Sequence, residues 1–458
     1  MQKEIFQIAA KAAEWRKLMF KLGKTKIPHR KNTAAMPAVR MPAPATVVIP
    51  VAQNIGAPST PIVKALDKVY VGTKIADAGG YVGAPIHSSV SGTVKKIDSF
   101  LLSNGRSCNA IIIESDGEMT PDPEIKAPVV TNLDEFCDAA RESGLVGLGG
   151  AGFPAAVKLD AGKKGIIKKA VINGAECEPY ITSDTRTMLD DADYVVKGVK
   201  LLEQYLSVEE VYIGIEKNKP EAIAKLTELF ASDSKVKVVT LPSTYPQGAE
   251  KILIHNTTGL VVPEGGLPSD VGCLVMNVTS LAFLARYIET GMPLVEKCLT
   301  VDGSAIESPK NVIAPIGASI KDIIEFTGNP IDDNVGKVMY GGPMMGIAVY
   351  NLDDPILKNT NAITVLNKKD AVSPKSYPCI HCGRCVSACP MGLNPTSYAK
   401  AMKVEDKNER ADRLVAAKLN LCMECGCCSF VCPSRRPLVE TNRLAKADLR
   451  NTQAANKN

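Results

Sequence analysis

The spacing of apolar and polar positions changes several times along the chain, and each change predicts a different local structure. Over residues 1–22 apolar side chains recur every three or four positions, which predicts an amphipathic helix. Residues 33–50 contain four prolines, which favours an extended connector. Short β-branched runs punctuated by glycines then predict strands and turns, with strands at 46–51, 68–71, 93–97 and 110–114.

From residue 132 onward the pattern predicts helices that alternate with strands. Helical spacing covers 135–141, 191–205 and 220–230, and strand patterns cover 169–173, 211–215 and 236–241. Such alternation predicts an α/β layer with a mostly parallel sheet, in which ligands bind at the carboxyl ends of the strands. After residue 293, short strands and a helix at 319–326 predict a small α+β unit.

Length and composition set outer limits on the class of protein. A chain of 458 residues predicts two to four domains, and 45% hydrophobic with 22% charged residues is typical of a globular protein. No apolar run approaches the roughly 18 residues of a membrane span, so we expect no transmembrane segment. Both ends of the chain are basic and the centre is acidic. Aromatic residues do not alternate with the basic ones, which argues against a nucleic-acid site and leaves docking surfaces or solvated faces.

Fourteen cysteines are the unusual feature of the composition, and nine of them lie between Cys379 and Cys432. Charged residues interrupt every apolar stretch near the N-terminus, so we expect no signal peptide and a reducing cytosol. There, clustered cysteines more often bind metal or carry out redox chemistry than form disulfides. No role is assigned to five scattered cysteines, namely Cys108, Cys137, Cys177, Cys273 and Cys298.

Eight of the clustered cysteines form two copies of the pattern C-x2-C-x2-C-x3-C-P, and Cys427 lies outside this register. The pattern suits two [4Fe-4S] clusters, because three cysteines of one motif bind one cluster and the fourth binds the other. The predicted ligand sets are Cys379, Cys382, Cys385 and Cys432 for one cluster, and Cys422, Cys425, Cys428 and Cys389 for the other. A four-cysteine zinc site is the alternative, but it explains neither the third cysteine nor the Cys-Pro ending. This region resembles bacterial dicluster ferredoxins.

A glycine-rich loop at 144–154 is the second candidate for chemistry, with Gly147, Gly149 and Gly152 in a G-x-G-x-x-G pattern. Main-chain N-H groups of such a loop can approach a phosphate closely, and Lys158 follows with a positive charge. A helix rather than a strand leads into the loop, which departs from the dinucleotide fingerprint, so a flexible turn is the alternative. Two one-electron centres need a donor, which favours a two-electron cofactor here.

Residues 69–97 resemble the barrel-sandwich fold of biotinyl and lipoyl carrier domains. In those carriers a lysine in a hairpin bears the prosthetic group. The corresponding turn here reads His87-Ser88-Ser89, which favours a structural role over that of a swinging arm.

The glycine loop together with NGAECEPY (173–180), YPQGAEK (245–251) and NVTS (277–280) resembles the flavin-binding subunit of respiratory complex I. The resemblance to the RnfC family, which belongs to the Rnf electron-transport complex, is closer and covers nearly the whole chain, including YGGPMMG (340–346). It implies FMN contacts from Gly147, Gly149, Gly150, Gly152, Lys158, Asn173, Glu176 and Asn277. It also places the catalytic candidates Phe153 and Glu178, with Glu250, beside NAD(H). Buried structural carboxylates are the alternative for Glu176 and Glu178, and Ala175 and Ala249 stand where complex I has acids.

The expected fold is multidomain α/β and α+β. It comprises a barrel-sandwich hybrid, an FMN domain like that of the complex I flavoprotein, a soluble-ligand-binding β-grasp and a dicluster ferredoxin. The expected bounds are 1–45 for a helix and linker, 46–128 for the barrel, 129–290 for the FMN and NADH domain, 291–365 for the β-grasp, and 366–458 for the ferredoxin and tail.

The resemblance implies an electron-transfer subunit that exchanges hydride between NAD(H) and FMN and single electrons with two [4Fe-4S] clusters. Its expected place is peripheral, on the cytoplasmic side of the cell membrane. There it would join other subunits of a ferredoxin:NAD+ oxidoreductase that transports Na+ or H+, with ferredoxin as an indirect partner. Residues 23–29 depart from the family's glycine-pair and histidine motif, which leaves a soluble relative that donates electrons from NADH to a reductase. A zinc-bearing scaffold is the third alternative.

Overall fold

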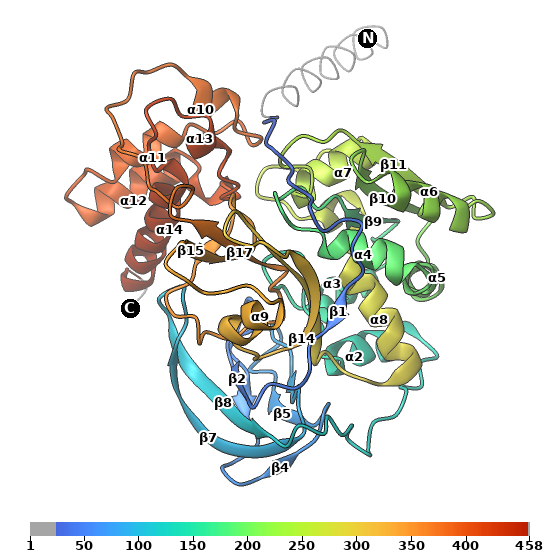
Figure 1. Cartoon of the computed structure of the whole chain (residues 1–458). Coiled ribbons are helices and arrows are strands. Elements are labelled where there is room, and N and C mark those ends of the chain that lie inside the picture. Colours follow the sequence, from blue (N-terminus) through green and yellow to red (C-terminus); the bar gives the residue numbers. More distant parts are fainter. Residues whose placement is uncertain (1–23, 457–458) are drawn as a thin grey trace, which may run out of the picture. The chain divides into compact units, whose positions relative to one another are not determined.

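The computed structural model describes residues 24–456, which fall into two compact units (Figure 1). Within the described residues, the first unit contains 24–28, 243–252 and 373–456, and the second contains 29–242 and 253–372. The helix predicted over residues 1–22 lies outside the described part of the chain. Among residues 24–456, the structure contains no helix with the length and apolar character of a membrane span.

The N-terminal part of the second unit is a barrel-sandwich of two antiparallel sheets. Alternate apolar side chains, such as Val47, Ile49 and Ile111, fill the space between the sheets. One sheet contains β2 (Thr46–Pro50), β8 (Ser107–Ser115), β7 (Gly92–Leu101) and β4 (Lys68–Val69), and the other contains β3 (Thr60–Pro61), β5 (Lys74–Asp77) and β6 (Ile86–His87).

The turn that bears the prosthetic group in carrier domains is buried in this barrel. His87, Ser88 and Ser89 are all buried, and the Ser89 hydroxyl donates a hydrogen bond to the main-chain oxygen of Ile316 at 2.5 Å. A buried turn tied to a distant segment is what a structural role requires.

The middle of the second unit is built on a parallel sheet in the order β11-β10-β9-β12, which confirms the predicted α/β layer. Its strands are β9 (Lys169–Gly174), β10 (Glu210–Glu216), β11 (Val236–Leu241) and β12 (Cys273–Asn277). Its helices are α2 (Leu133–Glu142), α3 (Ala155–Asp160), α4 (Ser183–Asp190), α5 (Ala192–Leu206), α6 (Pro220–Leu229), α7 (Glu250–Thr258) and α8 (Val278–Thr290), and residues 250–252 at the start of α7 belong to the first unit.

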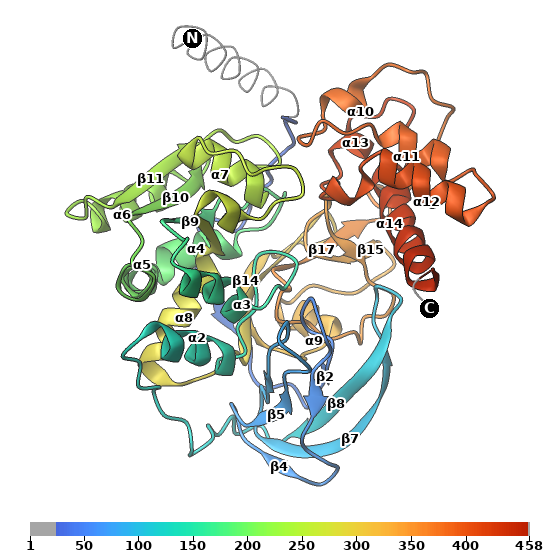
Figure 2. The ribbon, with the colours of Figure 1, turned by 180° about the vertical axis from the view of Figure 1, so that it is seen from behind.

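Helices cover both faces of this sheet, as expected for parallel strands (Figure 2). Ala170 and Ile172 of β9 face a core shared with α2, α5 and α8. Val171, between them in the strand, faces Leu253 and Ile254 of α7 on the other side. The glycine-rich loop runs from the end of α2 to α3, as the sequence predicts.

The C-terminal part of the second unit is a mixed sheet in the order β1-β14-β13-β17-β15-β16. The central strand β13 pairs antiparallel with β14 and parallel with β17, which agrees with the predicted β-grasp. The proline-rich connector adds β1 (Val39–Arg40) to the edge of this sheet. The remaining elements are β13 (Glu296–Asp302), β14 (Lys310–Pro315), α9 (Ile320–Phe326), β15 (Val335–Tyr340), β16 (Ile347–Ala348) and β17 (Ala362–Asn367).

The first unit is mainly helical and repeats one backbone arrangement at the two cysteine motifs. Gly383 and Gly426 have φ values of 73° and 77°, and each precedes a short helix that carries the third cysteine of its motif. His381 and Glu424, two positions earlier, also have positive φ. The helices are α10 (Arg384–Ser387), α11 (Pro395–Ala401), α12 (Lys407–Ala416), α13 (Cys427–Phe430) and α14 (Leu438–Ala455).

Candidate functional site

The eight motif cysteines line two separate cavities in the first unit, four at each. Each set takes three cysteines from one motif and the fourth from the other. One cavity, of about 190 Å³, is lined by Cys379, Cys382, Cys385 and Cys432. The second is lined by Cys422, Cys425, Cys428 and Cys389, together with the buried Cys427. The exchange of the fourth cysteine between motifs is the arrangement that two [4Fe-4S] clusters require.

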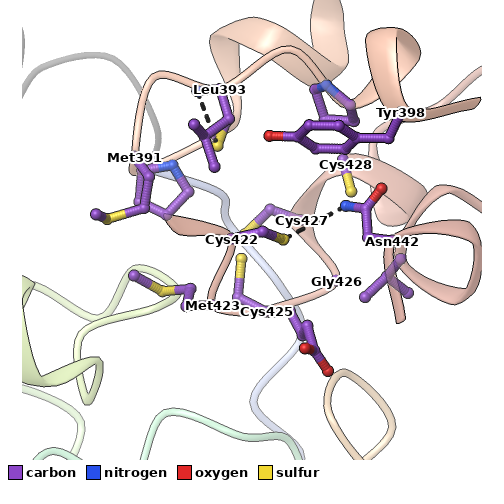
Figure 3. A pocket seen from close by; sticks show the side chains of 15 residues that line it. Met391, Leu393, Tyr398, Cys422, Met423, Cys425, Gly426, Cys427, Cys428 and Asn442 are labelled. Atoms are coloured by element: carbon purple, nitrogen blue, oxygen red, sulfur yellow. Dashed lines mark hydrogen bonds between the residues drawn. The ribbon is translucent and has the colours of Figure 1, made fainter. Parts of the chain in front are cut away.

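Apolar and amide side chains surround the second cavity (Figure 3). Met391, Leu393 and Tyr398 lie around the sulfurs, and the Asn442 side-chain amide donates to the Cys422 sulfur at 3.4 Å. The N-H of Leu393 donates to the Cys389 sulfur at 3.3 Å. Hydrogen bonds to ligand sulfurs and exclusion of water are two ways in which a protein sets the potential of a cluster.

The donor set at these cavities, four cysteine sulfurs from the motifs at each, is the set that a [4Fe-4S] cluster takes. Among residues 24–456, no group of three or more His, Cys, Asp or Glu side chains is arranged to hold one metal ion. Burial raises the pKa of the Cys428 thiol to about 12, so this side chain is protonated at neutral pH in the absence of a metal. Thiolate ligation therefore depends on the metal itself.

The glycine-rich loop is held at both ends and open in the middle. The N-H of Gly147 donates to the main-chain oxygen of Phe153 at 2.9 Å, which closes the loop. The Asn359 side chain donates to the Gly150 oxygen at 3.0 Å, and the N-H of Ile55 donates to the Gly152 oxygen at 3.1 Å. Within the described residues, the N-H groups of Gly149, Gly150 and Gly152 have no acceptor, so they are available to a ligand.

Gly149 fits only because it has no side chain. A Cβ atom at this position would lie 2.3 Å from the side-chain nitrogen of Asn277. That nitrogen donates to Asp184 at 2.8 Å, and the Asn277 oxygen accepts from the N-H groups of Thr279 and Ser280 to cap α8. The structure thus brings together two predicted FMN contacts, Gly149 and Asn277, at the start of α8.

Three other predicted residues lie on elements around the loop. Lys158 on α3 donates to the main-chain oxygen of Val275 in β12 at 3.2 Å. The Asn173 side chain, at the carboxyl end of β9, accepts from the N-H of Ala175 at 3.2 Å. Phe153 follows the last glycine of the loop and is partly exposed.

Glu176 is buried in a bent loop that follows β9. Its backbone has a φ of 47°, and its carboxylate accepts hydrogen bonds from the N-H of Asp184 at 2.6 Å and the hydroxyl of Thr185 at 2.5 Å. Burial raises the pKa of Glu176, against the attraction of Lys31 and Lys219. These contacts make Glu176 an anchor between the loop and the first turn of α4.

A half-buried lysine, Lys31, and a buried one, Lys219, hold the same loop through its carbonyl groups. The Lys31 ammonium donates to the main-chain oxygens of Glu176, Glu178 and Ile181 at 2.7, 2.8 and 2.6 Å. Lys219 donates to the oxygen of Ala175 at 2.7 Å. Burial lowers the pKa of Lys31 to about 8, against the attraction of Glu176. The shape of the loop is therefore fixed by charges that the chain itself supplies.

Glu178 is held by the YGGPMMG segment that follows β15. Its carboxylate accepts from the N-H groups of Met344 and Met345 at 3.1 and 2.7 Å. A Cβ on Gly342 would lie 2.3 Å from a carboxylate oxygen of Glu178, so the segment needs glycine there. Glu250, the first residue of α7, belongs to the first unit. Glu178 and the YGGPMMG segment belong to the second unit, and the two units are described separately.

Several residues that position the site were not predicted from the sequence. Asp184 and Thr279 form a hydrogen bond of 2.7 Å beside Asn277, and Lys31 lies in a segment whose pattern fits the family poorly. The run NVTS does contain Thr279, so a polar helix start was a usable signal there. No local pattern pointed to Lys31, Lys219 or Asn442, because their partners are distant in sequence.

Family models match three parts of the chain that correspond to these sites. An RnfC barrel sandwich hybrid domain matches residues 18–118, a Nuo51 FMN-binding domain matches 140–286, and a 4Fe-4S dicluster domain matches 375–435. The chain is therefore an iron-sulfur flavoprotein of the oxidoreductase class, with FMN and two [4Fe-4S] clusters as cofactors.

Curated relatives identify the family. The C subunit of the proton-translocating ferredoxin:NAD(+) oxidoreductase complex of Clostridium ljungdahlii is 44% identical over 80% of this chain and 80% of its own length. The C subunit of the Na(+)-translocating complex of Acetobacterium woodii is 42% identical over 81% of this chain and 85% of its own length. The chain belongs to this family, the C subunits of ion-translocating ferredoxin:NAD+ oxidoreductases.

A solved structure shares the fold. The air-oxidized state of an NAD+-reducing [NiFe]-hydrogenase matches with a TM-score of 0.50 and 17% identity, over 70% of this chain and 66% of that one.

Proposed function

We propose that this chain is the NAD-side subunit of a membrane-bound ferredoxin:NAD+ oxidoreductase, placed peripherally on the cytoplasmic side. It exchanges hydride between NAD(H) and FMN, and single electrons between FMN and two [4Fe-4S] clusters. The observation that carries the proposal is the convergence of eight cysteines as two sets of four, in a chain that also holds the glycine loop.

The relatives' names differ in the transported ion, protons in one complex and sodium ions in another. For this chain we propose the electron-transfer step, with the other subunits as partners and ferredoxin as an indirect one.

The glycine loop and its neighbours would hold FMN. Bound FMN accepts a hydride and gives up its electrons singly. The N-H groups of Gly149, Gly150 and Gly152 are free to bind a phosphate, and Gly147 closes the loop. Asn277 holds Gly149 in place, while Lys158 and Asn173 lie on the adjacent elements. Glu176 keeps the neighbouring loop attached to α4.

Phe153 and Glu178 are the residues proposed to meet the nicotinamide nucleotide, with Glu250. Phe153 presents a partly exposed aromatic ring next to the loop, and such a face can stack against a nucleotide ring. The two N-H groups that bind Glu178 fix the direction of its carboxylate, which can accept hydrogen bonds from the hydroxyl groups of a ribose.

Each cluster would be held by one of the two sets of four cysteines. Cys379, Cys382, Cys385 and Cys432 would hold one, and Cys422, Cys425, Cys428 and Cys389 the other. The two motifs exchange their last cysteines, so both clusters must lie within one small fold. Short separation is what electron transfer between them needs.

Cofactor content of the anaerobically purified chain tests this proposal. The expected result is one FMN and about eight irons per chain. Zinc in place of iron, or a chain that binds neither flavin nor iron, contradicts it. Pull-down under mild detergent then separates the membrane complex from a soluble donor, because the proposal requires integral membrane subunits to co-purify.

A further inference from the structure

A cavity of about 600 Å³ lies in the second unit and touches the glycine loop at Leu148. Its walls come from the connector at 40–43, from α8 and from β13, with Leu148 as its contact with the loop region. This volume is typical of sites for small organic molecules. None of the residues assigned above to FMN, NAD(H) or the clusters lines it.

Most of the cavity wall is apolar, and most of its charges are already paired. Phe283, Met292 and Leu294 are among the apolar side chains that line it. Arg40 pairs with Glu296, and Arg286 pairs with Asp191 at 2.6 Å, so these four residues add no net charge.

Lys297 is the exception. It lines the cavity, its residue is only 2% exposed, and its ammonium has no hydrogen-bond partner among the described residues. An unpaired buried ammonium is strongly unfavourable, and buried charges are normally paired. Burial lowers the pKa of Lys297, against a weaker attraction from Asp184. An anionic group bound in the cavity would supply the partner that Lys297 lacks among the described residues.

The wall beside Lys297 is connected to the candidate flavin site. Thr279 and Thr187, which both line the cavity, form a hydrogen bond of 2.8 Å with each other. Thr279 also donates to Asp184, which accepts from Asn277 against Gly149. A ligand in this cavity would therefore contact the same polar network that holds the glycine loop.

We propose that this cavity is a second ligand site, which binds an organic anion whose carboxylate or phosphate pairs with Lys297 and whose apolar body fills the remaining space. One unpaired point charge favours a single anionic group. The apolar wall and the volume exclude a bare inorganic ion as the best ligand.

Four probes separate the parts of this proposal. Octanoate and octyl phosphate carry the two kinds of anionic head, 1-octanol carries the same length of chain without charge, and inorganic phosphate carries charge without the chain. Each is titrated by calorimetry into the anaerobic holoprotein below its aggregation concentration. At least one of the two anionic amphiphiles should bind about tenfold or more tightly than octanol, because charge-assisted hydrogen bonds are the strong ones.

Two variants test the residues. Lys297→Met keeps the length of the side chain and removes the charge, so the preference for the anion should disappear while octanol binding remains. Ala43→Phe changes a partly exposed connector residue and narrows the cavity, so it should weaken every amphiphile. Lys321→Met, an exposed lysine outside the cavity, is the matched control and should change nothing.

Equal binding of octanol and both anions overturns the proposal, as does an anion preference that survives Lys297→Met. Unchanged binding in Ala43→Phe overturns the location. Inorganic phosphate that binds as tightly as octyl phosphate overturns the apolar part of the ligand. None of these results depends on flavin or iron content, so they are separate from the test of the electron-transfer function.

Discussion

Gly149 shows how one missing side chain determines the shape of the candidate flavin loop. A Cβ atom there would meet the Asn277 amide at 2.3 Å. If that amide rotated away, it would lose two hydrogen-bonded contacts. Its oxygen caps α8, and its nitrogen donates a hydrogen bond to Asp184. We expect Gly149→Ala to lower the free energy of unfolding by about 1–3 kcal/mol and to reduce the FMN retained per chain. Thermal unfolding and released-flavin fluorescence measure the two effects.

Gly150→Ala is the matched control for this prediction. A Cβ at Gly150 would have no heavy atom within 4 Å, so the stability of the protein itself should not change. Equal loss of stability in both variants would show that the clash with Asn277 is not the cause.

Lys358 gives a prediction about pH. Its fully buried ammonium donates to the oxygens of Pro85 and Gly144 at 2.6 and 2.7 Å, and burial lowers its pKa from 10.5 to about 7. Because the unfolded chain binds this proton more tightly, the contribution of Lys358 to stability is present above pH 10.5 and is lost as the pH falls through 7.

We therefore expect the unfolding free energy of the wild type, relative to Lys358→Met, to rise by up to about 1.4 kcal/mol per pH unit between about pH 7 and 9. Urea unfolding followed by circular dichroism measures it. Lys321→Met, on the surface, should show a constant difference from the wild type over this range. A constant difference for Lys358→Met as well would contradict the lowered pKa.

Among elements, the loop between β9 and α4 depends on the segment that precedes the barrel. Lys31 supplies three hydrogen bonds to the carbonyl groups of this loop, and Glu178 lies within it. Lys31→Met should remove three hydrogen bonds from this loop and loosen it. We expect the KM for NADH to rise several-fold, with a smaller change in the rate of flavin reduction at saturating NADH.

Stopped-flow reduction by NADH measures both quantities. Lys26→Met removes the same charge from an exposed position in the same segment and is the control. An unchanged KM in Lys31→Met would contradict the role of Lys31 in shaping this loop.

Elements with a clear period could be predicted from the sequence, and the others could not. The strands at 169–173, 211–215 and 236–241 are rich in valine and isoleucine, and the structure confirms them. The helix α4, with the sequence SDTRTMLD, has no apolar period, and its buried side chains of Thr185 and Asp184 form hydrogen bonds with Glu176 and Thr279. Such burial depends on distant partners, which no local pattern reveals.

For the whole molecule, the two cysteine motifs were predictable because iron-sulfur ligation imposes strict spacing, and the structure places the eight side chains in the two expected groups. The flavin residues depended on the resemblance to a family. The sequence did not predict the roles of Lys31, Lys219 and Asp184, because each binds a partner that is distant in sequence or a main-chain atom.

Because the cysteine cavities and the glycine loop belong to different units, we expect that a change at one cluster leaves flavin reduction intact. Cys385 lines one cysteine cavity only, so Cys385→Ser should remove or alter one cluster and lower the iron content by up to about half. Flavin reduction by NADH should keep its rate, since the glycine loop belongs to the second unit. Iron analysis and stopped-flow absorbance measure these effects, and Cys108→Ser, in strand β8, is the control.

The central claim is that one chain takes hydride from NADH and passes single electrons to its own clusters. An anaerobic absorbance titration of the purified holoprotein with NADH tests it most directly. We predict that NADH bleaches the flavin band and that the broad iron-sulfur absorbance then falls as the clusters equilibrate with the flavin. A flavin that NADH does not bleach, in a chain shown to contain FMN and iron, would contradict this claim.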